Sequence, residues 1–201
     1  MRYNDSYSTL ERRLLPVVRR GAAIAWAPVI VALGRLHVSP HAVSVSQLGF
    51  GALFWYWVLP APRLALAAFV GALLMDTLDG AFARSQGRSS AFGAFVDQLC
   101  DHARETLVVA ALASAGVLHA GLAVLYAFVY PAFNLVLLLC NRAGQPVPAA
   151  VKTLFLFYPT ILAYLGLGLN VLDWGITLAM LSMLISGGLA IARLAPAIHR
   201  A

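Results

Sequence analysis

The sequence carries few charged residues for its length. Only 11% of its 201 residues are charged, with 8 acidic and 14 basic side chains, whereas a soluble domain carries about a quarter charged residues. Hydrophobic residues make up 61% of the chain, and the mean hydropathy is +0.82. This shortage of charge excludes an ordinary soluble enzyme and indicates an integral membrane protein.

Cysteine is also scarce, and the surplus of basic residues is modest. Cys100 and Cys140 both lie in apolar segments, which favours inert buried thiols over a disulfide or a metal-binding pair. The net charge is +6. The basic residues cluster at the ends of apolar segments, a placement that suits anionic lipid head groups better than nucleic acid.

Long apolar runs follow one another from residue 41 onward. Runs of about 20 apolar residues are long enough to cross a bilayer, and short polar or proline-containing segments separate the runs here. Ser39 and Pro40 predict the start of the first helix, as N-cap and first helical residue. We predict six spanning helices over 41–59, 63–84, 91–116, 120–140, 150–169 and 172–193.

Residues 1–40 have a different pattern. Leucine and valine alternate with Arg12, Arg13, Arg19 and Arg20, which is typical of an amphipathic helix lying in the membrane interface. The apolar piece 21–36 is short for a span, and we interpret it as a second interfacial or half-inserted helix. A signal peptide is the alternative, but no small-x-small cleavage site follows and the polar lead is long.

The predicted fold is therefore an all-α integral membrane protein. It combines an N-terminal amphipathic, interfacial helical segment (1–40) with a six-transmembrane-helix bundle (41–201). Because the basic residues are distributed unevenly between the two sides, we expect both termini on the cytoplasmic side of the plasma or inner membrane. The acidic residues described next would lie toward that side.

Two pairs of aspartates fall inside the apolar helices predicted over 63–84 and 91–116. Asp76 and Asp79 are three residues apart and Asp97 and Asp101 four apart, so each pair shares a helix face. The polar segment 85–91 predicts a tight turn that makes the two helices antiparallel, with the acidic faces opposed. Four converging carboxylates repel one another unless a cation neutralises them, and hard divalent cations prefer oxygen ligands. We predict a site for two metal ions.

The same region has a recognisable pattern, D-x2-D-G-x2-A-R-x8-G-x3-D-x3-D. It resembles the signature of the CDP-alcohol phosphatidyltransferases, with every fixed position present. The resemblance implies transfer of a phosphatidyl group from CDP-diacylglycerol to a polar alcohol with release of CMP. It further implies Mg²⁺ or Mn²⁺ as cofactor, membrane lipid and substrate as partners without nucleic acid, and a homodimer.

The resemblance also assigns roles to residues. Asp76, Asp79 and Asp97 are implied metal ligands, and Asp101 a further ligand and the general base. The nucleotide and its diphosphate are expected to contact Asp79 and four other positions: Gly80, Ala83, Arg84 and Gly93. The glycines could instead only permit close helix packing, and Arg84 alone could be an interfacial anchor.

The acceptor is less well defined. Lys152-Thr153 resembles half of the Gly-Lys-x-Lys-Thr segment of phosphatidylglycerophosphate synthases, the other half being Ala149-Ala150. We therefore expect glycerol 3-phosphate as acceptor, bound by Lys152, Thr153 and Arg142, with inositol phosphate, inositol or serine as alternatives. Interfacial snorkelling is an equal interpretation of Lys152. His41 stands where the family usually has Asn.

Two other classes of function are alternatives to an enzyme. A cation transporter or channel also places acids within the membrane, but it predicts acids spread across the membrane depth. A catalytically idle scaffold would not need all four acids. Other polar residues in the predicted helices are interpreted as structural: His102, Arg104, Glu105 and Asn134.

Overall fold

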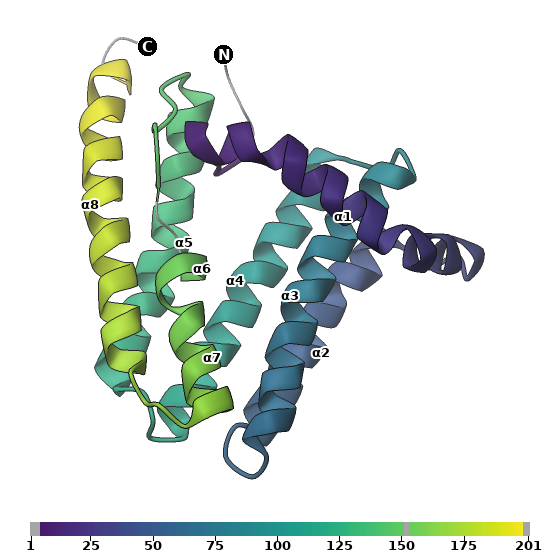
Figure 1. Ribbon diagram of the computed structural model, residues 1–201. Coiled ribbons are helices and arrows are strands. Elements are labelled where there is room, and N and C mark those ends of the chain that lie inside the picture. Colours follow the sequence, from purple (N-terminus) through teal and green to yellow (C-terminus); the bar gives the residue numbers. More distant parts are fainter. Residues whose placement is uncertain (1–4, 151–152, 199–201) are drawn as a thin grey trace. The chain divides into compact units, whose positions relative to one another are not determined.

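The protein is helical in the computed structural model, which describes residues 5–150 and 153–198 (Figure 1). No strand occurs among these residues, so the predicted all-α class is confirmed. The helices are α1 (Thr9–Arg35), α2 (Pro40–Trp57), α3 (Pro62–Ser85), α4 (Ala91–Ser114), α5 (Ala120–Arg142), α6 (Thr153–Leu156), α7 (Tyr158–Leu167) and α8 (Leu172–Ile198).

The chain forms two compact units. The first, called the α2–α4 unit below, comprises Leu15–Ala115. The second, called the α5–α8 unit, comprises Met1–Leu14 together with Gly116–Ala201.

Within the α2–α4 unit, α2 packs along both α3 and α4. Small residues on the facing surfaces allow this close approach: a Cβ at Gly71 would lie 2.7 Å from the ring of Phe50. The rings of Phe54 and Phe69 pack with centroids 6.0 Å apart. The tight packing of α2 against its two neighbours fixes the positions of the polar side chains that these helices carry.

The helices of this unit start at polar caps. The Ser39 hydroxyl accepts from Ala42 N at 3.1 Å, which confirms the predicted N-cap of α2, with Pro40 as its first residue. Ser90 caps α4 in the same way, accepting from Gly93 N at 3.0 Å. Gly87, with a φ of 63°, lies in the predicted turn between α3 and α4, a left-handed conformation that favours glycine.

The α5–α8 unit is built on the pair α5 and α8, with α6 and α7 against α8. The Cys140 thiol is fully buried and donates to Ala190 O at 3.5 Å. Cys100 is buried as well, and both thiols are free, as predicted. Asn141 Nδ2 donates to Asp5 O at 2.6 Å and to Tyr7 O at 3.0 Å, tying the N-terminal segment to the end of α5.

Two predictions about helix continuity were wrong. Residues 9–35 form one helix through Pro16 and Pro28, not two pieces. Conversely, the helix predicted over 150–169 is interrupted at Phe157, between α6 and α7. Pro159 follows two residues later and provides no backbone N–H, which accounts for the break. The other predicted helices agree with α2, α3, α4, α5 and α8 to within a few residues.

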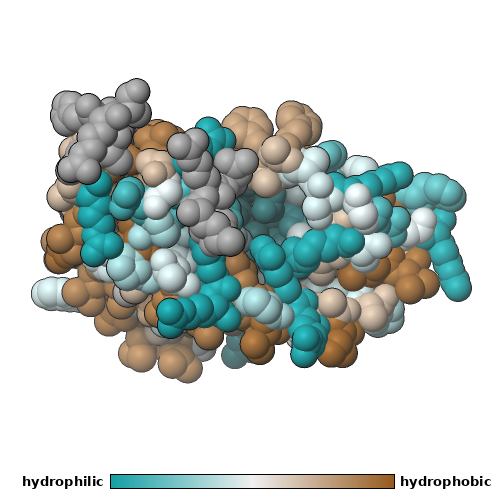
Figure 2. All heavy atoms as spheres, turned by 90° about the horizontal axis from the view of Figure 1, so that it is seen from above, coloured by the Kyte–Doolittle hydropathy of each residue, from teal (hydrophilic) through white to brown (hydrophobic). Residues whose placement is uncertain are grey.

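Four helices are long and apolar enough to cross a membrane: Thr9–Arg35, Pro62–Ser85, Ala120–Arg142 and Leu172–Ala195. These helices indicate a membrane protein, but the predicted count of six spans is not confirmed. The predicted interfacial position of 1–40 is not confirmed either, because α1 is itself one of the four. No residue of α1 is buried. Figure 2 shows that hydrophilic and hydrophobic residues both reach the surface on the face drawn.

Candidate metal and nucleotide site

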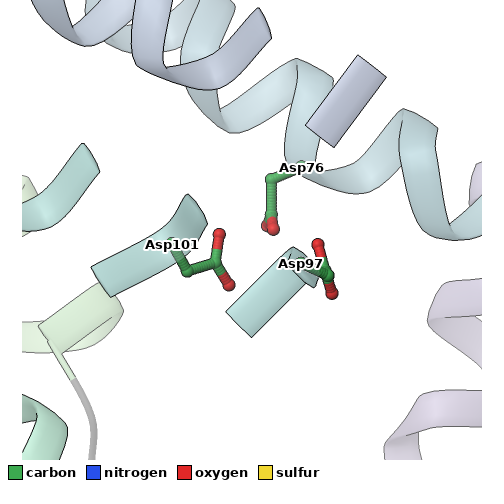
Figure 3. Close-up of side chains that lie close together, drawn as sticks. All are labelled: Asp76, Asp97 and Asp101. Carbon is green, nitrogen blue, oxygen red and sulfur yellow. The ribbon is translucent and has the colours of Figure 1, made fainter. Parts of the chain in front are cut away.

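Three carboxylates of the α2–α4 unit converge between α3 and α4. Asp76 comes from α3, and Asp97 and Asp101 come from α4 one turn apart. One oxygen from each lies within 4.8 Å of the other two, and the side chains point toward one another (Figure 3). Carboxylates this close repel strongly in a medium of low dielectric. The arrangement therefore suits a divalent cation with oxygen ligands.

Asp79, the fourth predicted ligand, lies outside this group of three. Its side chain is 3% exposed, and its Oδ2 accepts from Gln47 Nε2 at 3.2 Å. Among the described residues, neither Oδ1 of Asp79 nor Oδ1 of Asp97 has a hydrogen-bond partner, although both are buried. Buried polar atoms are nearly always paired. One of these two oxygens belongs to Asp97, in the three-carboxylate cluster, and the other to Asp79, and both fit the hard cation that the sequence predicts.

A chain of polar side chains behind the cluster connects its two acidic helices. Arg104 Nη1 donates to Asp101 Oδ1 at 3.2 Å and to Gln47 Oε1 at 2.7 Å. Its Nη2 lies 3.9 Å from Oε2 of Glu105. Gln47, Arg104 and Glu105 are each at most 3% exposed. The guanidinium offsets part of the negative charge that the carboxylates bring together.

Sequence reasoning did not find this chain. The sequence pattern predicts only structural roles for Arg104 and Glu105 and no role for Gln47. The signals were present, because Arg104 lies three residues after Asp101 on the same face. Gln47 is an amide in the otherwise apolar middle of α2.

Gly80, Ala83 and Arg84 lie on the last two turns of α3. A Cβ added to Gly80 would be 3.1 Å from Nη1 of Arg84, so the guanidinium lies directly over this glycine. Arg84 is exposed and Ala83 is partly exposed. The missing side chain at Gly80 thus leaves room for the Arg84 guanidinium, a group that can bind phosphate.

Gly93 occupies the first turn of α4 beside the start of α2. A Cβ on Gly93 would lie 3.2 Å from Ser90 Oγ and 3.5 Å from Cε1 of His41. The His41 ring also packs edge-on against Phe92, with centroids 5.8 Å apart. His41, the departure from the family pattern, is therefore next to one of the predicted nucleotide positions.

The predicted acceptor residues belong to the α5–α8 unit. Arg142 is exposed at the end of α5. Thr153 is 2% exposed, and its hydroxyl lies 2.7 Å from the hydroxyl of Tyr126. Lys152 lies outside the described residues. The acceptor site predicted from these three residues therefore stays a prediction.

Comparison with known proteins gives two curated relatives. The chain is 33% identical over 93 residues to archaetidylinositol phosphate synthase of Aeropyrum pernix, covering 45% of this chain and 48% of the relative. It is 32% identical over 108 residues to an uncharacterised protein of Aquifex aeolicus, covering 52% of each. The matches thus span about half the length of these relatives.

A solved structure has a similar fold. The phosphatidylinositol phosphate synthase of Mycobacterium tuberculosis, determined with CDP-DAG bound, superposes with a TM-score of 0.62. The similarity covers 83% of this chain and 92% of that one, at 17% sequence identity. At this identity the likeness concerns the fold.

A family model extends over most of the chain. The model of the CDP-alcohol phosphatidyltransferases matches residues 36–192, which include the whole acidic cluster and the pattern that carries it. The chain belongs to the CDP-alcohol phosphatidyltransferase family.

Proposed function

We propose that the protein transfers a phosphatidyl group from CDP-diacylglycerol to the hydroxyl of a polar alcohol and releases CMP. The observation that carries this proposal is the convergence of Asp76, Asp97 and Asp101 within 4.8 Å, inside the complete family pattern. Family membership supports the class of reaction. A transporter would be expected to have acidic residues spread through the membrane depth. The clustering of the acidic residues here favours an enzyme instead.

Asp76, Asp97 and Asp101 would hold the cation, with Asp79 beside them through its unpartnered Oδ1. We propose Mg²⁺ or Mn²⁺ as the cation, because all the ligands would be carboxylate oxygens. We keep the two positions predicted from the sequence, because four carboxylates contribute to the site. Such a cation, when bound, neutralises charge on the diphosphate and makes CMP a better leaving group.

The remaining roles fall to the chain's own side chains. Arg84 would orient the diphosphate, and Gly80 and Gly93 would leave space for the nucleotide against the backbone. Asp101 would accept the proton of the acceptor hydroxyl while the oxygen of that hydroxyl bonds to the β-phosphorus of the donor. At the same time the bond from that phosphorus to the CMP oxygen breaks. A general base must reach the proton that it removes, and Asp101 lies in the cluster itself.

For the acceptor we now favour an inositol phosphate over glycerol 3-phosphate. Two similar proteins are named archaetidylinositol phosphate synthase and phosphatidylinositol phosphate synthase. The argument for glycerol 3-phosphate rested on Lys152-Thr153, and the Thr153 hydroxyl is engaged by Tyr126. Glycerol 3-phosphate, inositol and serine remain the comparison substrates.

The sidedness and assembly of the protein are part of the proposal. The excess of basic residues flanking the predicted spans supports both termini and the acidic cluster on the cytoplasmic side. Water-soluble nucleotide and alcohol would be available there, while the acyl chains of the donor stay in lipid. We carry the homodimer over from the family resemblance.

The direct test is CMP release from CDP-diacylglycerol by the protein purified in detergent. Inositol 1-phosphate, glycerol 3-phosphate, inositol and serine would each be supplied with Mg²⁺, and each reaction repeated with excess EDTA. We expect release with inositol 1-phosphate and none with EDTA. CMP release with glycerol 3-phosphate alone would contradict the assignment of inositol phosphate as the acceptor. CMP release that persists in EDTA would contradict the proposed metal site. No release with any alcohol would overturn the function as proposed.

A further inference from the structure

The buried side chain of Gln47 connects the two acidic helices. Its Nε2 donates to Asp79 on α3 at 3.2 Å. Its Oε1 accepts from Arg104 on α4 at 2.7 Å, and Arg104 donates in turn to Asp101 at 3.2 Å. The chain Asp79–Gln47–Arg104–Asp101, called the Gln47–Arg104 bridge below, thus joins α2, α3 and α4.

The chemistry of its neighbours fixes the orientation of the Gln47 amide. A guanidinium can only donate hydrogen bonds and a carboxylate can only accept them. A flipped amide would place its NH₂ against Arg104 and its carbonyl against Asp79, which loses both bonds. Gln47 is 0% exposed, so water cannot compensate for that loss. The amide therefore has one stable orientation, in which it links a cation to an anion.

The bridge also decides which carboxylate oxygens remain available. It engages Oδ2 of Asp79 and Oδ1 of Asp101. Oδ1 of Asp79 has no hydrogen-bond partner among the described residues, and the second oxygen of Asp101 lies outside the bridge. Each of these carboxylates is therefore held by one oxygen, and its other oxygen takes no part in the bridge.

We propose that Gln47 and Arg104 are positioning residues that preset Asp79 and Asp101 for the divalent cation. This inference rests on the proposed function, because it concerns the same carboxylates. The bridge holds two like-charged helices at a set separation before the cation binds, and Arg104 supplies part of the charge that would otherwise drive them apart. Partners of metal ligands typically change metal affinity or activity by about 10–100-fold when removed.

The test is Mn²⁺ binding, measured by electron paramagnetic resonance on detergent-purified protein with CMP present and without lipid or alcohol. Gln47→Met keeps the length of the side chain and removes both hydrogen bonds. We expect its Mn²⁺ dissociation constant to rise by about 10–100-fold. The matched control is Asn134→Met, because Asn134 is a buried amide of the α5–α8 unit that donates to Tyr130 O. The control should bind Mn²⁺ like the wild type.

A second variant covers the case in which Gln47→Met does not fold. Gln47→Asn keeps the amide but is one methylene too short to reach Asp79 and Arg104 together, so weaker Mn²⁺ binding is expected here also. A third arm combines Gln47→Met with Asp79→Asn. Residues acting through one another are non-additive, so the double variant should lose less Mn²⁺ affinity than the losses of the two single variants combined. It should still bind more weakly than Asp79→Asn alone, because Gln47 also acts on Asp101 through Arg104.

The outcomes separate the bridge from the proposed function. Unchanged Mn²⁺ affinity in a folded Gln47 variant, or full additivity with Asp79→Asn, overturns the bridge whatever the turnover. A wild-type protein that binds Mn²⁺ but releases no CMP overturns the proposed function. The Mn²⁺ affinities of the Gln47 variants then still decide whether the bridge positions the carboxylates. A wild type that binds no Mn²⁺ overturns both the metal site and the bridge.

Discussion

The two units of the molecule bury polar groups of different kinds. In the α2–α4 unit the buried polar side chains include a carboxylate, a guanidinium and a second carboxylate, Asp79, Arg104 and Glu105. In the described part of the α5–α8 unit they are neutral: Ser8, Asn134, Asn141 and Thr153. Both units are helical, so the difference does not come from the fold class.

The neutral groups of the α5–α8 unit have close neutral partners. Asn134 and Asn141 donate to backbone carbonyls at 2.6–3.0 Å, and Thr153 pairs with the hydroxyl of Tyr126. In the α2–α4 unit, by contrast, oxygens of Asp79 and Asp97 are buried without a partner among the described residues. Burying charge is costly unless it is compensated. The comparison teaches that the neutral buried groups named above are paired within the α5–α8 unit, whereas one oxygen each of Asp79 and Asp97 in the α2–α4 unit is not paired among the described residues.

The largest loss of activity is expected on substitution of Asp101, in the α2–α4 unit. Asp101→Asn keeps an oxygen that can accept from Arg104, but it removes the basic carboxylate. We expect CMP release to fall by about 10²–10⁴-fold, measured at saturating donor and acceptor. The matched control is Asp173→Asn, because Asp173 lies on α8 and accepts from His119 N at 2.9 Å. Full activity of Asp101→Asn would overturn its assignment as the general base.

A smaller effect is expected at Gly80. The Cβ of Gly80→Ala would lie 3.1 Å from Nη1 of Arg84, so the guanidinium must move. A hydrogen bond to a charged group contributes about 1.5–3 kcal/mol, and about 1.4 kcal/mol corresponds to a factor of ten. We expect the KM for CDP-diacylglycerol to rise by about tenfold with little change in thermal stability.

The control for Gly80→Ala is Gly188→Ala on α8, where an added Cβ meets no atom within 4 Å. The control should have a wild-type KM. An unchanged KM in Gly80→Ala would indicate that Arg84 does not contact the donor. A large loss of thermal stability would instead indicate that Gly80 serves helix packing.

The smallest effect on turnover is expected in the α5–α8 unit. Asn141→Ala removes the donor to Asp5 O and Tyr7 O and should cost about 1–3 kcal/mol of stability. Thermal unfolding in detergent should register that loss, while CMP release stays within about twofold of the wild type. A folded Asn141→Ala protein that has lost turnover would break the contrast between the two units.

Much of the site was predictable because its residues are close in sequence. Asp76 with Asp79, and Asp97 with Asp101, share helix faces by spacing alone, and the turn at Gly87 opposes the two helices. The pattern could not show that three of the four carboxylates converge within 4.8 Å and that Asp79 is not one of them. Nor could it show that Gln47, some thirty residues earlier in the chain, reaches Asp79.

The helix boundaries were also predictable where they depend on residues close in sequence. Caps and prolines predicted the start of α2 and the breaks between helices, since these act over a few residues. The interruption at Phe157 and the continuity of α1 through Pro16 and Pro28 were missed. Proline disfavours a helix locally, but the hydrogen bonds of the flanking turns decide whether the helix continues.

The sequence by itself determined the all-α membrane class, the family pattern and the identity of the four acidic residues, because composition and short spacings are local properties of the chain. Only the tertiary structure decided which carboxylate oxygens are engaged and which are left open. That choice depends on the packing of α2 against both α3 and α4, which buries Gln47 and Arg104 among the acids. Contacts between residues far apart in the chain arise only when the helices pack.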